Sequence, residues 1–286
     1  MVISAGVRFM ILAGILFSSM NVLVKLLPNI PAVELVFFRS LISFVVSFSI
    51  LRIKRINPWG THRGLLLSRG LVGAVALITY FYLLQEIPLA TATTLQFITP
   101  IFTAALGIIF IKEKVKPLQW LFFGVSFLGV LVTNGFDTRI SWVHIGMGLL
   151  AAAFAGGAYT IIRKLNTREH PLVIVLYFPL ITLPLTGVIS WFYWVMPQGI
   201  EWVILLGIGL LTQFAQLFMT KAYQSDELSK IANLKYLSLV YALVYGYFIF
   251  GETYTFTSYL GMLLVVVGVS ANVWIKSKKK QAKVAG

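Results

Sequence analysis

The sequence contains no cysteine, only three histidines and few charged residues. The absence of cysteine excludes disulfide bonds, thiol catalysis and thiolate metal sites. Charged residues are 11% of the 286 residues, compared with about a quarter in soluble proteins, whereas 59% are hydrophobic. This composition excludes a soluble globular protein. It predicts an all-α integral membrane protein, because isolated strands cannot satisfy their backbone hydrogen bonds in lipid.

Ten apolar runs bounded by proline, glycine and charged residues are long enough to cross a bilayer, which takes about 20 residues. We expect ten transmembrane helices with short connections and no extramembrane domain. The first run is longer than a signal-peptide core and lacks a small-residue cleavage site, so we expect it to remain in the mature protein. The runs cover residues 8–27, 31–51, 65–84, 88–111, 117–135, 144–165, 171–193, 200–223, 228–250 and 257–275.

The 23 lysines and arginines are distributed asymmetrically between the connections. With a cytoplasmic N-terminus, nineteen lie on the cytoplasmic side, Lys25 and Arg139 lie outside, and Arg39 and Lys235 lie within runs. This asymmetry predicts a multi-pass protein of the cell membrane, plasma or inner, with both termini in the cytoplasm. The formal net charge of +14 is therefore interpreted as topology and contact with anionic lipid headgroups, and no nucleic-acid partner is expected.

The two halves of the chain share weak similarities at one common offset. A shift of 139 residues places the motif IKE, ending at Glu113, on the motif FGE, ending at Glu252. Each half holds five runs, an odd number, so the halves must cross the membrane in opposite orientations. We expect two inverted five-helix repeats, residues 1–138 and 139–276, and a basic cytoplasmic tail, residues 277–286. In transporters built this way the substrate site lies near the bilayer midplane.

Four segments carry a resemblance that extends over nearly the whole chain. They are FFRSLISF at 37–44, LLLSRGLVGAVALITYFYLL at 65–84, IPLATATTLQFITPIFTAALGIIFIKEK at 87–114 and FGETYTFTSYLGMLLVVVGV at 250–269. Together they resemble the EamA-type carriers of the drug/metabolite transporter superfamily, and most closely the branch that includes group G of solute carrier family 35. The resemblance implies ten helices in two inverted repeats and secondary transport or exchange of a small metabolite. Lys112 before Glu113 replaces the frequent Gly-Glu, a mild departure.

Two basic residues are expected deep inside their helices. Arg39 lies about 12 Å, and Lys235 about 10 Å, from the nearer end of its run at a rise of ~1.5 Å per residue. A central charge costs roughly 2.5 to 3.5 kcal/mol, and no acidic residue lies at similar depth. We expect both to face an anionic group of the substrate. The alternative is that Lys235 extends to the interface and Arg39 bonds the backbone.

Polar and aromatic side chains on the same runs could complete this site. Gln96 is offset by 139 residues from Lys235, as expected of a pseudo-symmetric pair. The remaining candidate substrate-binding residues are Phe97, Gln213, Gln216, Asn233, Tyr236 and Tyr80. The alternatives are interhelical hydrogen bonding for the polar residues and interface anchoring for tyrosine. Pro100 and Pro179 each free a carbonyl within a run, either as part of a gate or as a static kink.

All nine acidic residues lie at or near the ends of runs, and the three histidines lie in loops or at run ends. A proton relay of buried carboxylates or imidazoles is therefore not expected. Glu34, a few residues into its run, is the one acid that could face a cavity. Glu113 and Glu252 lie just outside helix ends and are interpreted as helix caps or loop anchors rather than substrate ligands.

These features predict an alternating-access carrier or exchanger of a small organic metabolite that bears a carboxylate or phosphate. The alternative is export of zwitterionic amino acids or of a nucleoside-type cofactor such as S-adenosylmethionine, whose positive end would meet carbonyls and aromatic faces. An enzyme is not expected, because the scattered histidines and carboxylates form no catalytic cluster. No cofactor or metal is expected. The sequence leaves the oligomeric state open and is compatible with a monomer.

Overall fold

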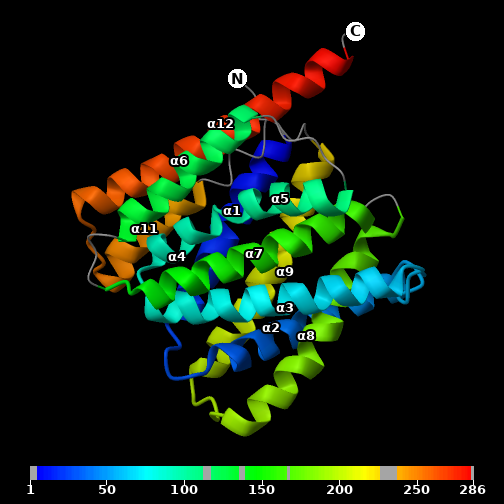
Figure 1. Ribbon diagram of the computed structural model, residues 1–286. Coiled ribbons are helices and arrows are strands. Elements are labelled where there is room, and N and C mark those ends of the chain that lie inside the picture. The colour runs from blue at the N-terminus through cyan, green and yellow to red at the C-terminus, as the bar shows by residue number, and fades with distance from the viewer. Residues whose placement is uncertain (1–4, 112–116, 135–138, 166–167, 226–236, 285–286) are drawn as a thin grey trace.

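The computed structural model describes residues 5–111, 117–134, 139–165, 168–225 and 237–284. Within these residues the chain forms helices joined by short loops and contains no strand (Figure 1). The helices are α1 (Ala5–Lys25), α2 (Ala32–Ile53), α3 (Arg63–Glu86), α4 (Leu89–Gln96), α5 (Thr99–Ile111), α6 (Pro117–Asn134), α7 (Trp142–Leu165), α8 (Pro171–Tyr193), α9 (Glu201–Ser225), α11 (Leu237–Phe250) and α12 (Phe256–Val284).

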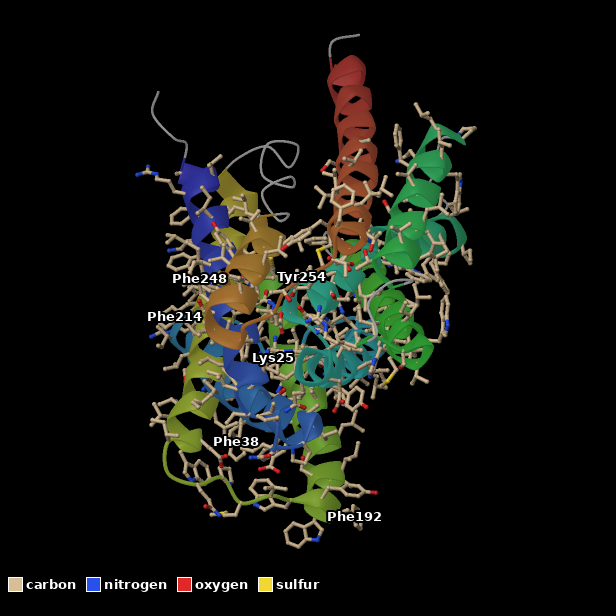
Figure 2. All side chains as sticks on the ribbon, turned by 90° about the vertical axis from the view of Figure 1, so that its left-hand side faces the viewer. Lys25, Phe38, Phe192, Phe214, Phe248 and Tyr254 are labelled. Carbon is tan, nitrogen blue, oxygen red and sulfur yellow. The ribbon has the colours of Figure 1, made fainter. Side chains whose placement is uncertain are left out.

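Seven stretches of the described residues are long and apolar enough to span a bilayer. The helical segments Pro117–Thr133, Leu237–Phe250 and Phe256–Gly268 are also apolar but shorter. Large apolar side chains point away from the helix bundle, among them Phe214 and Phe248 (Figure 2). A surface of this kind suits lipid rather than water. The prediction of an all-α membrane protein is therefore confirmed.

The single helix expected over 88–111 is instead two helices, α4 and α5, separated by a turn at Phe97 and Ile98. Pro100 explains the break, because proline has no amide hydrogen to donate to the carbonyl of Gln96 and its ring crowds that carbonyl. In the structure Pro100 lies in the first turn of α5, where a missing amide hydrogen costs little. The expected kink at Pro100 is thus a full interruption of the helix.

The helices pack in pairs drawn from the two halves of the chain. α1 lies against α9 and α3 against α7, while α2 pairs with α8 and α6 pairs with α12 (Figure 1). The α6–α12 pair approaches closely through glycine: a Cβ on Gly129 would lie 2.7 Å from the carbonyl oxygen of Gly261. Small residues at such crossings are typical of helix packing in membranes.

The main apolar core joins α1, α2, α3 and α4. Leu35 of α2, Phe81 and Leu84 of α3, and Leu89 of α4 are fully buried in it. Because these side chains interdigitate at high density, they hold α2, α3 and α4 at fixed positions. The core therefore provides a rigid frame next to Arg39 of α2.

Candidate functional site

Arg39 lies buried where α2, α3, α8 and α9 meet, with 6% of its surface exposed. Its Nε donates a hydrogen bond to the hydroxyl of Thr212 on α9, 3.2 Å away. Its guanidinium carbon lies 5.3 Å from the ring centre of Phe178 on α8 and 5.9 Å from that of Phe81 on α3. Aromatic faces attract a cation at these distances, so they reduce the cost of burying the charge. Arg39 thus lies inside the helix bundle, almost wholly shielded from the protein surface.

No carboxylate neutralises Arg39 within the described part of the chain. The ion pairs there join Lys25 to Glu252 and His62 to Glu169. Glu34 is fully buried on the same helix, but its Oε2 accepts a hydrogen bond from the Val195 amide at 3.0 Å. Nη1 of Arg39 is buried without a hydrogen-bond acceptor. Arg39 is therefore a buried cation without a carboxylate partner among the described residues, and no hydrogen bond from it to their backbone is observed.

Arg69 of α3 is a second arginine of this region, half-buried, and one of the nineteen basic residues that the sequence analysis placed on the cytoplasmic side. Its guanidinium carbon lies 4.6 Å from the ring centre of Phe178, and its Nε and Nη1 are buried without acceptors. Arg69 is the seventh residue of α3, so its Cα lies about 9 Å from the helix start at ~1.5 Å per residue. Its position inside the expected run 65–84 was the one signal in the sequence, although a residue so near a run end is typical of cytoplasmic arginines.

The two guanidinium groups form a concentrated positive region. Both contact the Phe178 ring, so their carbons are at most about 10 Å apart, the sum of the two distances to its centre. Two like charges at this separation repel by about 2 kcal/mol at an effective dielectric constant of ~20. A planar guanidinium fork matches the two oxygens of a carboxylate or phosphate. The chemistry that this region can perform is therefore anion binding.

The other candidate residues are only partly brought together. The hydroxyl of Tyr80 accepts a hydrogen bond from Asn21 of α1 at 3.0 Å, and Thr99 donates to Gln96 at 3.5 Å. Phe97 packs against the main core, while Gln213 and Gln216 are half-buried on α9, one and four residues after Thr212. Among the described residues none of these side chains hydrogen-bonds to Arg39. Three candidates, Asn233, Lys235 and Tyr236, lie outside the described residues.

Pro179 follows Phe178 in the middle of α8 and is buried. Its missing amide hydrogen leaves the carbonyl of Val175 without a helical donor. A proline at this place can bend α8 next to the aromatic ring that both arginines contact. Pro100, by contrast, is exposed at the start of α5. Of the two expected kink residues, Pro179 is the one beside the arginines.

Glu252 anchors the loop before α12 to the first half of the chain. Its Oε1 lies 3.1 Å from Nζ of Lys25, and its Oε2 accepts hydrogen bonds from the Leu89 amide at 2.9 Å and the Tyr254 hydroxyl at 2.7 Å. The Leu89 amide belongs to the first turn of α4, so Glu252 caps that helix. The interpretation of Glu252 as a cap is confirmed, while Glu113 lies outside the described residues.

Glu169 anchors a second loop, the one that precedes α3. It accepts hydrogen bonds from the amide and hydroxyl of Thr61, at 2.7 and 2.6 Å, and from the amide of His62. Burial acts to raise the pKa of Glu169, but these hydrogen bonds outweigh it and lower the pKa from 4.5 to about 2. The carboxylate therefore holds the loop before α3 in place as an anion.

Glu169 predicts a pH dependence of stability. Because its folded-state pKa is depressed, its contribution is complete above the unfolded value of 4.5 and is lost as the pH falls towards about 2. We expect Glu169→Gln to unfold at a lower temperature than wild type at pH 6, by the equivalent of about 1 kcal/mol for a lost cap. The difference should shrink between pH 5 and pH 3 in detergent-solubilised protein, and a constant difference would contradict this role.

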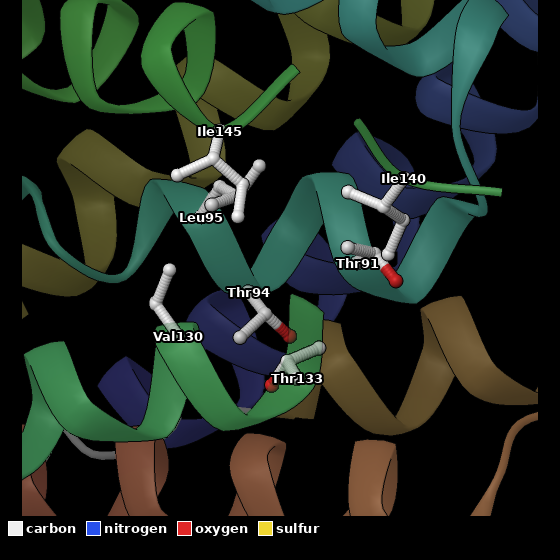
Figure 3. A pocket seen from close by; sticks show the side chains of 7 residues that line it. All are labelled: Thr91, Thr94, Leu95, Val130, Thr133, Ile140 and Ile145. Carbon is white, nitrogen blue, oxygen red and sulfur yellow. The ribbon is translucent and has the colours of Figure 1, made fainter. Parts of the chain in front are cut away.

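Two hollows lie apart from the arginines. The first, of about 10 Å³, is large enough for about one water molecule and lies between α4, α6 and α7 (Figure 3). The second, of about 410 Å³, is lined by the start of α2, the end of α3 and Met147 of α7. Neither has Arg39 or Arg69 in its lining. Within the described residues no group of His, Asp and Glu side chains is arranged to hold a metal ion.

Comparison with known proteins gives consistent similarities over nearly the full length. The EamA-like transporter family model matches residues 4–135 and again residues 142–274. The chain is 32% identical to the pseudopaline exporter CntI of Pseudomonas aeruginosa strain PAO1, covering 94% of this chain and 96% of the exporter. It is 28% identical to human solute carrier family 35 member G1, covering 96% and 81%. It is 25% identical to the S-adenosylmethionine uptake transporter of Rickettsia prowazekii, covering 97% and 95%.

A solved structure supports the fold independently. The crystal structure of another protein superposes on this chain with a TM-score of 0.66 at 16% sequence identity. The match covers 96% of this chain and 98% of the other protein's chain. At this identity the likeness concerns the arrangement of helices and not the substrate. Arg39 and Arg69 must therefore be interpreted from their own surroundings.

Proposed function

Because the chain belongs to the EamA-like transporter family and is a membrane-embedded transporter of a small metabolite, we propose that its substrate bears a carboxylate or phosphate that binds Arg39. One observation carries this proposal: Arg39 is 6% exposed, and no carboxylate of the described residues neutralises it. A buried charge without a partner is costly. A substrate anion would remove that cost when it binds, so the site favours anions over neutral compounds.

The transport cycle that we propose is alternating access between two inverted five-helix repeats, residues 1–138 and 139–276. The packing supports this, because an exchange of the two halves converts the α1–α9 contact into the α7–α3 contact. The same exchange converts α2–α9 into α8–α3 and leaves the α2–α8 and α6–α12 pairs unchanged. A pseudo-twofold arrangement of this kind permits one half to rock against the other around a central site. The two matches to the family model also support it.

The orientation and location in the cell are part of the same proposal. The basic residues favour a multi-pass protein of the plasma or inner membrane with both termini and the tail 277–286 in the cytoplasm. Figure 1 shows the described N- and C-terminal ends at the same side of the molecule, as an even number of crossings requires. We further propose that Lys235, Asn233 and Tyr236 join the site from the second half, where Lys235 corresponds to Gln96.

The test of substrate class is a thermal-shift screen of purified wild-type protein. The panel contains carboxylates, phosphate esters and amino acids, each with the amide or alcohol of the same skeleton. A ligand that binds only the folded state raises the unfolding temperature. At a concentration 100 times its Kd, it adds about 2.7 kcal/mol to the free energy of unfolding. We expect anions to stabilise the protein and their neutral analogues to have no effect. Equal stabilisation by the neutral analogues would contradict the proposal.

A zwitterionic amino acid or a nucleoside-type cofactor is the second candidate class. The rings of Phe81 and Phe178 flank Arg39, so a planar base or a cationic centre could contact an aromatic face while its carboxylate binds the guanidinium. A relative at 25% identity is named as an S-adenosylmethionine uptake transporter. In the same screen this class predicts that S-adenosylmethionine stabilises the protein more than simple carboxylates do.

A further inference from the structure

The direction of the Arg69 side chain distinguishes it from an arginine that reaches for the interface. Its Nη1 lies 3.0 Å from the place that a Cβ on Gly73 would occupy, and Gly73 is one turn further along α3. Side chains on helices normally lean towards the helix start, and an arginine near a membrane surface extends towards that surface. Arg69 instead extends deeper into its helix bundle, and Gly73 leaves room for it.

Arg39 and Arg69 have buried donor nitrogens that no acceptor among the described residues satisfies. Three nitrogens, Nη1 of Arg39 and Nε and Nη1 of Arg69, are buried without an acceptor among the described residues. The two groups come from neighbouring helices and share the ring of Phe178. A monoanion bound at Arg39 would leave the charge of Arg69 unneutralised. A ligand with two negative groups would neutralise both.

We propose that Arg39 and Arg69 form one two-cation site for a dianionic substrate, either a dicarboxylate or a compound that joins a carboxylate to a phosphate. Each guanidinium fork binds one anionic group, and Phe178 lies against the apolar part that connects them. The inference rests on the proposed function, because it takes Arg39 as the first anion contact. It adds Arg69 as a residue that determines specificity, and it sets the charge of the substrate.

The test compares diacids with monoacids of the same carbon number, adipate with hexanoate and glutarate with pentanoate. Their affinities for purified, full-length protein are measured by thermal shift. We expect each diacid to bind wild type at least about tenfold more tightly than its monoacid, the effect of one additional charged contact. In Arg69→Gln the diacid should bind no better than the monoacid, whereas Arg69→Lys should retain part of the preference. Arg63→Gln, at the exposed start of the same helix, is the matched control and should behave as wild type.

The outcomes separate this inference from the proposed function. Equal affinity for diacid and monoacid in wild type, or a diacid preference that persists in Arg69→Gln, would overturn the two-cation site. If the monoacids still lose their binding in Arg39→Gln, the single-anion function stands. Binding of both acids that is unchanged in Arg39→Gln, or no binding of either acid to wild type, would overturn the proposed function and the two-cation site with it. If a variant fails to fold, the preference of the wild-type protein for diacid over monoacid decides whether the two-cation site stands.

Discussion

Arg39→Gln is expected to reduce transport by at least about 30-fold, because truncating one partner of a buried charged contact costs roughly 2 to 5 kcal/mol. Glutamine keeps the polarity of the position but removes the positive charge and the planar fork. The measurement is counterflow in proteoliposomes of the anion that stabilises wild type most in the thermal-shift screen. Arg52→Gln is the matched control, since Arg52 is an exposed arginine of the same helix and should leave counterflow unchanged.

The stability of a second variant, Arg39→Met, tests whether Arg39 serves binding or folding. Arg39 is buried and uncompensated, so replacing it with an apolar side chain of similar length removes a desolvation cost. We expect Arg39→Met to unfold at the same or a higher temperature than wild type without ligand, and to be inactive in counterflow. A large loss of stability would show instead that the contacts with Thr212 and Phe178 make Arg39 a structural residue.

The depth of Arg39 could be predicted from sequence because helix rise and distance from Pro31 determine it. The role of Glu252 could be predicted because it lies just outside a helix end. Arg69 could not be assigned in the same way, since its position near a run end is typical of cytoplasmic arginines. Only the approach of α8 and the space beside Gly73 show that it extends inward.

The break between α4 and α5 shows a second limit of sequence analysis. Hydropathy is continuous over 88–111, so the run alone predicts one helix. Pro100 indicates a weak point, but whether a proline bends or ends a helix depends on how its neighbours pack. The capping of α4 by Glu252 comes from the far end of the sequence. A contact over such a sequence separation has no local signal, and the same holds for the bond between Arg39 and Thr212.

Glu252→Ala is expected to lower the free energy of unfolding by about 3 to 5 kcal/mol, the cost of removing one partner of a buried ion pair. The exposed fractions of the Lys25 and Glu252 side chains are 13% and 8%. The change would leave Lys25 without its counterion, and the Leu89 amide and the Tyr254 hydroxyl without the oxygen that accepts their hydrogen bonds. The measurement is the unfolding midpoint of purified protein in detergent, with the transition followed by helical circular dichroism.

Two further variants separate charge from capping at this position. Glu252→Gln keeps an oxygen that can accept from the Leu89 amide but loses the attraction to Lys25, so we expect an intermediate loss. Glu86→Ala, an exposed glutamate at the end of α3, should change the free energy of unfolding by less than about 0.5 kcal/mol. If Glu252→Ala behaves like Glu86→Ala, the contacts of Glu252 do not hold the two halves together. A large loss would show that this carboxylate stabilises the junction between α1, α4 and the loop before α12.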